Sequence, residues 1–367
     1  MSVSPRLPDL PVEIHRRYAT RDDAVAAPLG GIELAPDTDV PGLWVNRAFE
    51  PSRVRYDAAY DNALQHAPTF VAFADELAAR LVKRFALHEG LTTEIGAGDG
   101  WFLDRLHAAG ARAVEGFDPK HAAGEVPRAN GDRRLLIARH VIEHVPDPVA
   151  WLRELRALLP DGGSMYLEAP AAEAMCEAPG GIGVLDLIYE HRSYFSVASL
   201  AACAEQAGFA VTDSGRAFYG QYAWIEATPG RSASVTEHPL PDVSVFIKDA
   251  VRCIARLDDD LARLASHGDI ALWGAGSKGK VLLNLLSEPD RVRFVYDANP
   301  GKWGAFVAGA GHEIRPPTEV GADAPATILV TNPAYRAEVE AAVRALTPRP
   351  VVRVVGRADD ALGASHA

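Results

Sequence analysis

The amino-acid sequence predicts an α/β fold made of two Rossmann-like units, of which the second is the smaller. Two glycine-rich stretches, 94–100 and 274–280, each follow a short apolar run and precede a run with helical periodicity. In both units the next apolar run ends in an acid, Asp118 or Asp297. Glycines at a strand-to-helix junction permit a tight turn and let a ligand approach bare backbone at the positive helix N-terminus. The repeated pattern therefore predicts two units of ligand-binding type.

The chain divides into five parts by composition. Its 367 residues can form two domains, each with its own core. We expect an N-terminal arm or lid over 1–68, rich in Pro, Asp and Arg, and a first core over 69–228. A linker over 229–242, rich in Pro and polar residues, precedes the second unit over 243–358. Residues 359–367 are predicted to form a frayed tail.

Composition also narrows the class of protein. The formal net charge of −12 argues against a nucleic-acid partner or an anionic membrane surface. No apolar run approaches the roughly 18 residues of a membrane span, and the N-terminus lacks the apolar core of a signal peptide. The three cysteines have no C-x-x-C spacing, so we expect neither a disulfide framework nor a metal site. We therefore expect a cytoplasmic protein acting on a small molecule; the oligomeric state stays open.

The first unit alternates helix and strand signals. Apolar residues at helical spacing precede the first strand: Phe70, Phe73, Leu77, Leu81 and Val82. That strand begins at Leu91, and the further predicted strands cover 113–118, 135–138, 164–170 and 220–227. Asp147 is expected to cap the helix after the third strand, with Pro148 in its first turn.

The stretch Glu94-Ile-Gly96-Ala97-Gly98-Asp-Gly100 differs from the G-x-G-x-x-G of dinucleotide binders. With an acid two residues before the first glycine, it resembles the first motif of S-adenosylmethionine (SAM)-dependent methyltransferases. The resemblance implies a class I methyltransferase core, in which the backbone of Gly96, Ala97 and Gly98 approaches the methionine part of SAM. Glu94 would then lie near the ammonium group.

Other residues are candidates for contacts with the same cofactor. Asp118 ends the second predicted strand, where an acid holds a ribose in doubly wound sheets. His140 follows the third strand and is expected to face SAM, and Tyr56 and Tyr60 are candidates for a lid over the pocket. Only 16 residues separate Asp118 from Leu135, so the sheet should be trimmed there. Which residue reads adenine stays open.

The second glycine-rich stretch allows more than one interpretation. Gly274, Gly276 and Gly279 fit the NAD fingerprint, and Asp297 lies 23 residues after Gly274. The stretch also fits G-x-x-x-x-G-K, but Val281 occupies the place where a P-loop needs Ser or Thr, which argues against an NTPase. An NAD-dependent oxidoreductase therefore remains an alternative to a Rossmann-like domain that grips the substrate or serves as a scaffold.

The whole chain resembles one methyltransferase family. Two runs carry the likeness most specifically: Tyr189-Glu190-His191-x-x-Tyr194-Phe195 and Asp297-x-Asn299-Pro300-x-Lys302. Together with further matches between residues 56 and 345, they resemble the three-part C-methyltransferases that act on nucleotide-linked deoxysugars in antibiotic and surface-glycan pathways. Two departures stand out. No cysteine precedes Cys176, so we expect the cysteine-rich zinc module of that family to be absent, and Tyr189 abuts Glu190 where family members usually have one residue in between.

The resemblance implies carbon methylation beside a ketone, with SAM as cofactor and a small-molecule substrate, possibly a nucleotide sugar. Such a reaction needs a base for the carbon-bound proton and donors to the enolate oxygen. We expect His191 to be the general base, Glu190 to orient a neighbour, and Tyr189 or His144 to stabilise the enolate. Tyr60 and Lys278 are candidates for substrate binding. Oxygen or nitrogen methylation, and a non-catalytic protein with a relict SAM pocket, remain alternatives.

Overall fold

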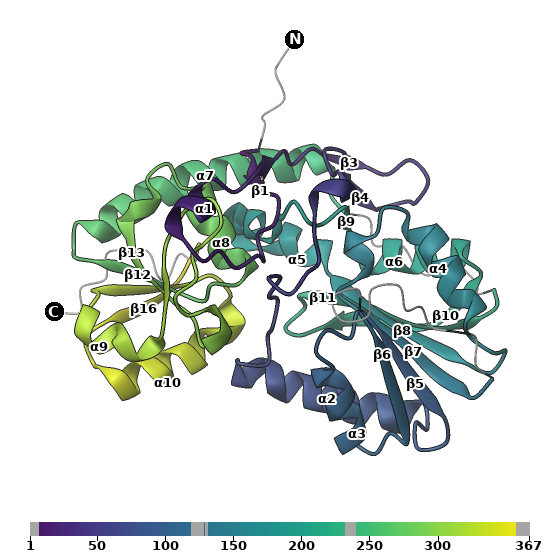
Figure 1. Cartoon of the computed structure of the whole chain (residues 1–367). Coiled ribbons are helices and arrows are strands. Elements are labelled where there is room, and N and C mark those ends of the chain that lie inside the picture. Colours follow the sequence, from purple (N-terminus) through teal and green to yellow (C-terminus); the bar gives the residue numbers. More distant parts are fainter. Residues whose placement is uncertain (1–6, 119–127, 129–130, 232–239, 357–367) are drawn as a thin grey trace, which may run out of the picture.

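The computed structural model describes residues 7–118, 128, 131–231 and 240–356. Two α/β units lie side by side, and the long helix α7 (Val243–Ala265) runs across both of them (Figure 1). The predicted tail and the middle of the predicted linker lie outside the described residues. Within the described part, no helix combines the length and apolar character needed to cross a bilayer.

The first unit is built on a six-stranded sheet of order β10-β11-β8-β7-β5-β6. Its strands are β5 (Leu91–Ile95), β6 (Ala113–Phe117), β7 (Arg133–Arg139), β8 (Ser164–Pro170), β10 (Phe209–Ala217) and β11 (Tyr222–Pro229). The first four are parallel, whereas β11 and β10 complete the sheet in antiparallel fashion. In the described residues β6 is the edge strand, at the point where the sequence predicts a trimmed sheet.

Successive residues of the parallel strands point to opposite faces of the sheet and pack into two separate apolar layers. Leu135 and Ile137 of β7 pack under helices α2 (Pro68–Arg84) and α3 (Trp101–Ala108). Leu136 and Ala138 point to the opposite face, which helices α4 (Pro148–Ala157) and α6 (Val197–Gln206) cover. As predicted, the Asp147 side chain caps α4 by accepting from the Ala150 N–H. Both faces of the sheet are thus covered, and the open ends of the parallel strands are left for function.

The second unit has a five-stranded parallel sheet of order β14-β13-β12-β15-β16. Its strands are β12 (Ile270–Trp273), β13 (Val292–Tyr296), β14 (Ile314–Arg315), β15 (Thr327–Val330) and β16 (Val351–Val354). Helices α8 (Ser277–Leu285), α9 (Val320–Asp323) and α10 (Arg336–Leu346) connect them. Helix α8 begins directly after the second glycine-rich loop, at the carboxyl end of β12, where ligands bind in such folds.

The N-terminal segment is more ordered than the expected irregular arm. It forms helix α1 (Arg21–Val25) and strands β1 (Leu10–Pro11), β2 (Leu29–Gly30), β3 (Leu34–Pro36) and β4 (Trp44–Asn46). β4 pairs with β9 (Ser193–Tyr194) of the first unit. Leu10, Val12 and Ile14 are buried in the same apolar cluster as residues of α7 and α8. The segment therefore forms part of the core between the two units, where Figure 1 shows it in purple.

Candidate active site

The first glycine-rich loop follows β5 and leaves its backbone accessible. Gly96 and Gly98 have φ of 76° and 57°, a left-handed conformation that favours glycine. A methyl group added to Gly98 would meet no atom within 4 Å, so the loop is open on that side. The Gly98 N–H donates to Asp118 Oδ2 over 2.9 Å, while Gly96 and Ala97 donate to the Phe117 carbonyl. Asp118 therefore braces the loop from the end of β6.

Glu94 is a buried acid at the end of β5. Its side chain is only 4% exposed, and Oε2 has no hydrogen-bond partner. Burial raises the pKa of Glu94 to about 7, although the charge of Arg139 opposes the shift. A buried carboxylate oxygen without a partner, beside a bare glycine loop, fits the cationic ammonium group of SAM. The residues present thus suit the cofactor that the sequence implies.

His140 lies where β7 ends, with a left-handed φ of 55°. Its Nδ1 is 3.6 Å from Glu143 Oε1, and its Nε2 is 3.4 Å from Glu168 Oε1. Burial alone would lower the pKa of His140, but the bonds to Glu143 and Glu168 outweigh it and raise the pKa to about 9. The ring also packs edge-on against Tyr222, 4.4 Å between centroids. His140 is therefore a cation held between two carboxylates.

His144 and His191 form a pair beside this cation. Their ring centroids lie 5.0 Å apart at 68°, and the Tyr56 ring packs edge-on against His144 at 5.6 Å. Burial lowers the pKa of His191 well below its ordinary value, and positive charge on His144 and His140 lowers it further. His191 is therefore neutral near pH 7 and able to accept a proton. One atom each of Glu143, His144 and His191 lie within 4.8 Å, a spacing that would also accommodate a divalent cation.

Glu190 is completely buried and faces the N-terminal segment. Its Oε1 accepts from the His15 N–H over 3.2 Å, and its Oε2 lies 3.6 Å from His15 Nε2. Burial raises the pKa of Glu190 to about 8 against the opposing effects of the His15 N–H and of Lys280. Burial also lowers the pKa of His15. Sequence analysis missed His15, because it lies in a segment taken as irregular; the alternation Val12-Glu13-Ile14-His15 was the available signal.

The structure does not bring Tyr189 to the other site residues. Its ring packs on Gly30, and its hydroxyl donates to the Ala48 carbonyl and accepts from the Glu50 N–H, both over 3.0 Å. Ile188 lines the cleft in its place. In this turn the Tyr189 side chain thus packs against the N-terminal segment, whereas Ile188 and His191 line the cleft.

A cleft between the two units is lined by three of the predicted site residues, His140, His191 and Lys278. From the first unit it is lined by His140, Glu143, Ile188, His191 and Tyr222, and from the second by Gly274, Gly276, Lys278, Asp297, Lys302 and Tyr335. His15, residues 61–64, His66 and Ala67 of the N-terminal part also line it. Lys278 forms an ion pair with Asp186. Tyr60 lies between Tyr56 and His15, with centroids 5.2 Å from each.

The first glycine loop does not itself line this cleft, but residues 61–67 reach it. Gln65 Nε2 donates to Asp99 Oδ2 over 3.1 Å. Residues 61–67 thus connect the cleft with the loop where SAM would bind.

The second glycine loop is braced in the same way as the first. The Ala275 N–H donates to Asp297 Oδ2 over 2.7 Å, and the Asn299 N–H donates to Asp297 Oδ1 over 2.8 Å. Both oxygens of Asp297 are therefore engaged within the second unit. An NAD ribose would have to compete for them, so the geometry does not favour a nicotinamide site here.

The fold, the bare first loop and the unpartnered Glu94 oxygen define the chain as a SAM-dependent methyltransferase. A family model described as a methyltransferase domain matches residues 70–214, and one described as a C-methyltransferase C-terminal domain matches 242–350. The C-methyltransferase NovU of Streptomyces niveus is 25% identical over 323 residues, 75% of this chain and 76% of that protein. These matches, one to each unit and one to a C-methyltransferase over both, support placing the chain among the C-methyltransferases.

Solved structures similar to the chain are matched over less than half of it. A SAM-dependent methyltransferase from Aquifex aeolicus is 15% identical, with a TM-score of 0.36 over 49% of this chain and 99% of that one. The 1,6-didemethyltoxoflavin-N1-methyltransferase of Burkholderia thailandensis is 18% identical, with a TM-score of 0.35 over 44% and 81%.

Proposed function

We propose that the chain transfers a methyl group from SAM to a carbon atom beside a ketone, on a nucleotide-linked deoxysugar or a related activated intermediate of small-molecule biosynthesis. One observation carries the proposal. His191, a histidine kept neutral by burial, lines a cleft that the second glycine-rich loop lines as well. A general base and a loop suited to bind an anionic group of the acceptor thus lie in one cleft.

The residues of the cleft suit a two-step reaction. His191 accepts the proton from the carbon, and the electrons of the broken C–H bond form the enolate. The Glu143 carboxylate, close to His191, stabilises the resulting imidazolium. When bound, SAM supplies an electrophilic methyl group whose bond to sulfur breaks as the new C–C bond forms. Holding the acceptor carbon in line with that bond is the main task left to the cleft.

Stabilisation of the enolate oxygen falls to a cationic histidine. His144 Nδ1 lies 2.9 Å from the Glu190 carbonyl, so Nε2 can donate only when the ring is protonated. His140 lines the cleft and is a cation below about pH 9. We therefore expect His144 to be the donor at the enolate oxygen in place of Tyr189, with the positive charge of His140, whose two ring nitrogens face carboxylates, adding electrostatic stabilisation.

The second glycine loop supports an acceptor with a diphosphate. Gly274 and Gly276 leave open space where other residues would carry a Cβ, and the first residues of α8 line the cleft. Helix N-termini attract phosphate groups, and Lys278 adds a positive charge beside them. Tyr60 and Lys278 stay our candidates for substrate contacts.

The test is turnover with methyl-¹³C SAM against a panel of nucleotide-linked keto sugars. We expect a product resonance typical of a methyl group on carbon; an O–CH₃ or N–CH₃ resonance would contradict the proposal. His191→Gln should lower kcat about 10²–10⁴-fold and leave SAM affinity unchanged. It should also abolish exchange of the acceptor's α-proton into D₂O when the demethylated cofactor is bound, because that exchange needs the base and no methyl transfer.

A further inference from the structure

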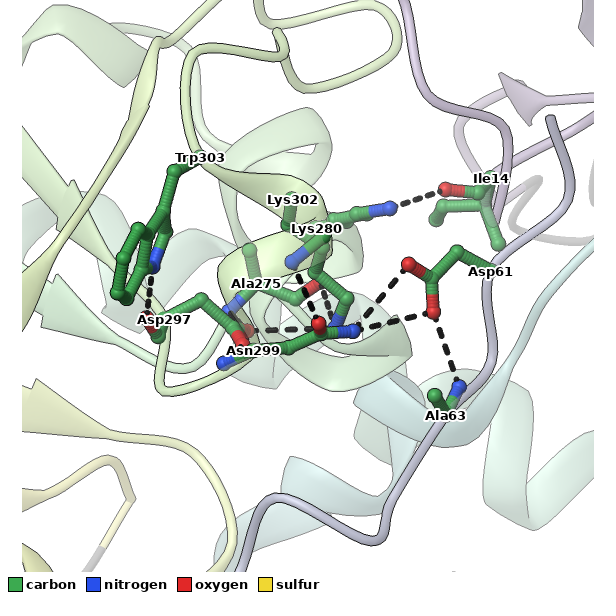
Figure 2. A network of polar contacts seen from close by, with 10 residues as sticks. Ile14, Asp61, Ala63, Ala275, Lys280, Asp297, Asn299, Lys302 and Trp303 are labelled. Carbon is green, nitrogen blue, oxygen red and sulfur yellow. Dashed lines mark hydrogen bonds and ion pairs between the residues drawn. The ribbon is translucent and has the colours of Figure 1, made fainter. Parts of the chain in front are cut away.

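Lys280 is a buried lysine of helix α8 that the proposed reaction does not use. Its side chain is 2% exposed, and Nζ donates to the backbone carbonyl of Ile14 over 2.9 Å. Figure 2 shows this bond crossing from the second unit to the N-terminal segment. Burying an ammonium group is unfavourable unless it is paired or hydrogen-bonded, so a lysine in this place calls for a function.

The carbonyl that Lys280 contacts belongs to the same peptide group as the His15 N–H. That N–H donates to Glu190 Oε1 over 3.2 Å. A single peptide group therefore links the ammonium of Lys280 at its carbonyl end to the carboxyl of Glu190 at its amide end. A cation at the carbonyl polarises the peptide and makes its N–H a stronger donor, because hydrogen bonds in a chain reinforce one another in a low dielectric.

Glu190 has few other groups that favour its charged form. Its titratable neighbours in the N-terminal part do not stabilise a negative charge on Glu190. The charge of Glu13 opposes it, and the remaining neighbours are neutral tyrosines: Tyr18, Tyr56 and Tyr60. The His15 imidazole beside it is held neutral by burial. The remaining partners are backbone N–H groups of Ile14 and His15, and Lys280.

Lys280 lies near a polar network of the second unit whose charges act on it electrostatically. Lys302 donates to the Ala275 carbonyl and to Asp297 Oδ2, and Asn299 donates to Asp61 (Figure 2). Burial and the nearby charge of Lys302 lower the pKa of Lys280 to about 8. Lys280 therefore remains a cation at neutral pH.

We propose that Lys280 is a positioning residue, which acts through the Ile14–His15 peptide to hold the Glu190 carboxyl in place and to favour its ionised form. The proposal rests on the proposed function only in taking Glu190 as part of the active site. The second unit then contributes to the chemistry directly, besides binding the substrate.

A titration that needs no substrate tests the first part. In protein labelled with ¹³C at Glu carboxyl groups, Glu190→Gln identifies the Glu190 resonance. Lys280→Met should move its titration midpoint upward by about one pH unit, because a nearby cation is lost. Lys280→Gln, which keeps an N–H donor without the charge, should show the same direction, and it serves if the Met variant does not fold. An unchanged midpoint in a folded variant would overturn the proposal.

Turnover tests the second part. Lys280→Met should lower kcat about tenfold at pH 7.5, leave the KM for SAM unchanged and move the acidic limb of the pH profile upward. In a Glu190→Gln background the same change should have little further effect. The control is Asn284→Ala, one turn along α8, which removes hydrogen bonds to the Lys280 and Ala308 carbonyls without touching Ile14. If Lys280→Met matched this control, with a uniform loss at every pH, its role would be structural.

The NMR titration and the turnover measurement test different claims, and either can give a negative result without the other. Should the acceptor prove not to be a carbon acid, the Glu190 titration would still report the link through the peptide. Should the titration be unaffected while carbon methylation is observed, only the role of Lys280 falls.

Discussion

His144 Nδ1 lies 2.9 Å from the backbone carbonyl oxygen of Glu190. A carbonyl oxygen only accepts hydrogen bonds, so Nδ1 carries the proton and Nε2 of the neutral ring is left as an acceptor. The orientation of one active-site histidine is thus set by the backbone of the neighbouring site residue. Because Glu190 is also tied to the N-terminal segment, three parts of the chain have to be in place before the histidine pair is ordered.

This bond predicts different outcomes for two substitutions of His144. Asn places an amide N–H near the position of Nδ1 and should keep the bond to Glu190, whereas Gln should lose it. We expect both variants to lose about 10²-fold in kcat, because each lacks the second ring nitrogen. Only His144→Gln should also change the thermal unfolding midpoint. A His144→Asn variant with normal kcat would contradict a role in the reaction.

Glu94 predicts a conflict between cofactor binding and stability. Its pKa is raised from 4.5 to about 7 in the folded state, so the folded state binds the proton more tightly than the unfolded state. Stability from this group is therefore present at low pH and is lost as pH rises from about 4.5 to 7. Without SAM, Glu94→Gln should stabilise the protein at pH 8 by up to about 3 kcal/mol and have little effect at pH 4.5.

The same substitution should weaken SAM binding. At pH 8 the carboxylate faces the ammonium of the cofactor, and Gln removes that attraction. Calorimetry at pH 6 and pH 8 should show tighter binding at pH 8 for the wild-type chain, and little dependence on pH for Glu94→Gln. Equal SAM affinity in the two proteins at pH 8 would rule out the assigned role.

Tyr189→Phe separates the sequence-based prediction from the structure. The hydroxyl bonds to the backbone of Ala48 and Glu50 and not to the histidine pair, so its loss should lower stability by about 1–2 kcal/mol and leave kcat nearly unchanged. Chemical denaturation and steady-state kinetics of the same preparation check both. A large drop in kcat at unchanged stability would restore the tyrosine to the reaction.

Substitutions of two glycines in the second loop should have different effects, one on acceptor binding and the other on stability. A methyl group on Gly276 would meet no atom within 4 Å, and its φ of −81° suits alanine, so Gly276→Ala should fold normally. The added methyl projects toward the cleft and should raise the KM of the acceptor. A methyl on Gly279 would lie 2.1 Å from the Gly274 carbonyl, so Gly279→Ala should destabilise the chain by about 1–3 kcal/mol. Neither should alter SAM affinity.

Local signals in the sequence were sufficient for the parallel strands of the first unit and for both glycine loops, whereas the short parallel strands β14 and β16 of the second unit were not predicted. Apolar runs, glycines and a capping Asp147 lie within a few residues of one another, so short-range physics decides them. The edge strand β10 was missed because polar residues such as Thr212, Asp213 and Ser214 interrupt its apolar pattern. An edge strand half open to water tolerates such residues.

Contacts across long sequence separations account for the rest. The pairing of His15 with Glu190 joins residues 175 positions apart, and no local pattern marks it. The direction of Tyr189 depended on a one-residue shift in a loop without regular periodicity, so neither helical nor strand spacing could decide it. The sequence predicts the position of Asp297 at the end of β13. It does not predict that both carboxylate oxygens accept hydrogen bonds from backbone N–H groups of the second unit.

The bond between Ile14 and Lys280 spans 266 residues and has a consequence for synthesis. At about 5–20 residues per second, the ribosome completes α8 some ten to fifty seconds after the N-terminal segment has emerged. Until then Leu10, Val12 and Ile14 lack the partners that bury them in the finished protein. A nascent chain that already contains the entire SAM-binding sheet would therefore still lack an ordered catalytic centre, and would expose an apolar segment on which chaperones can act.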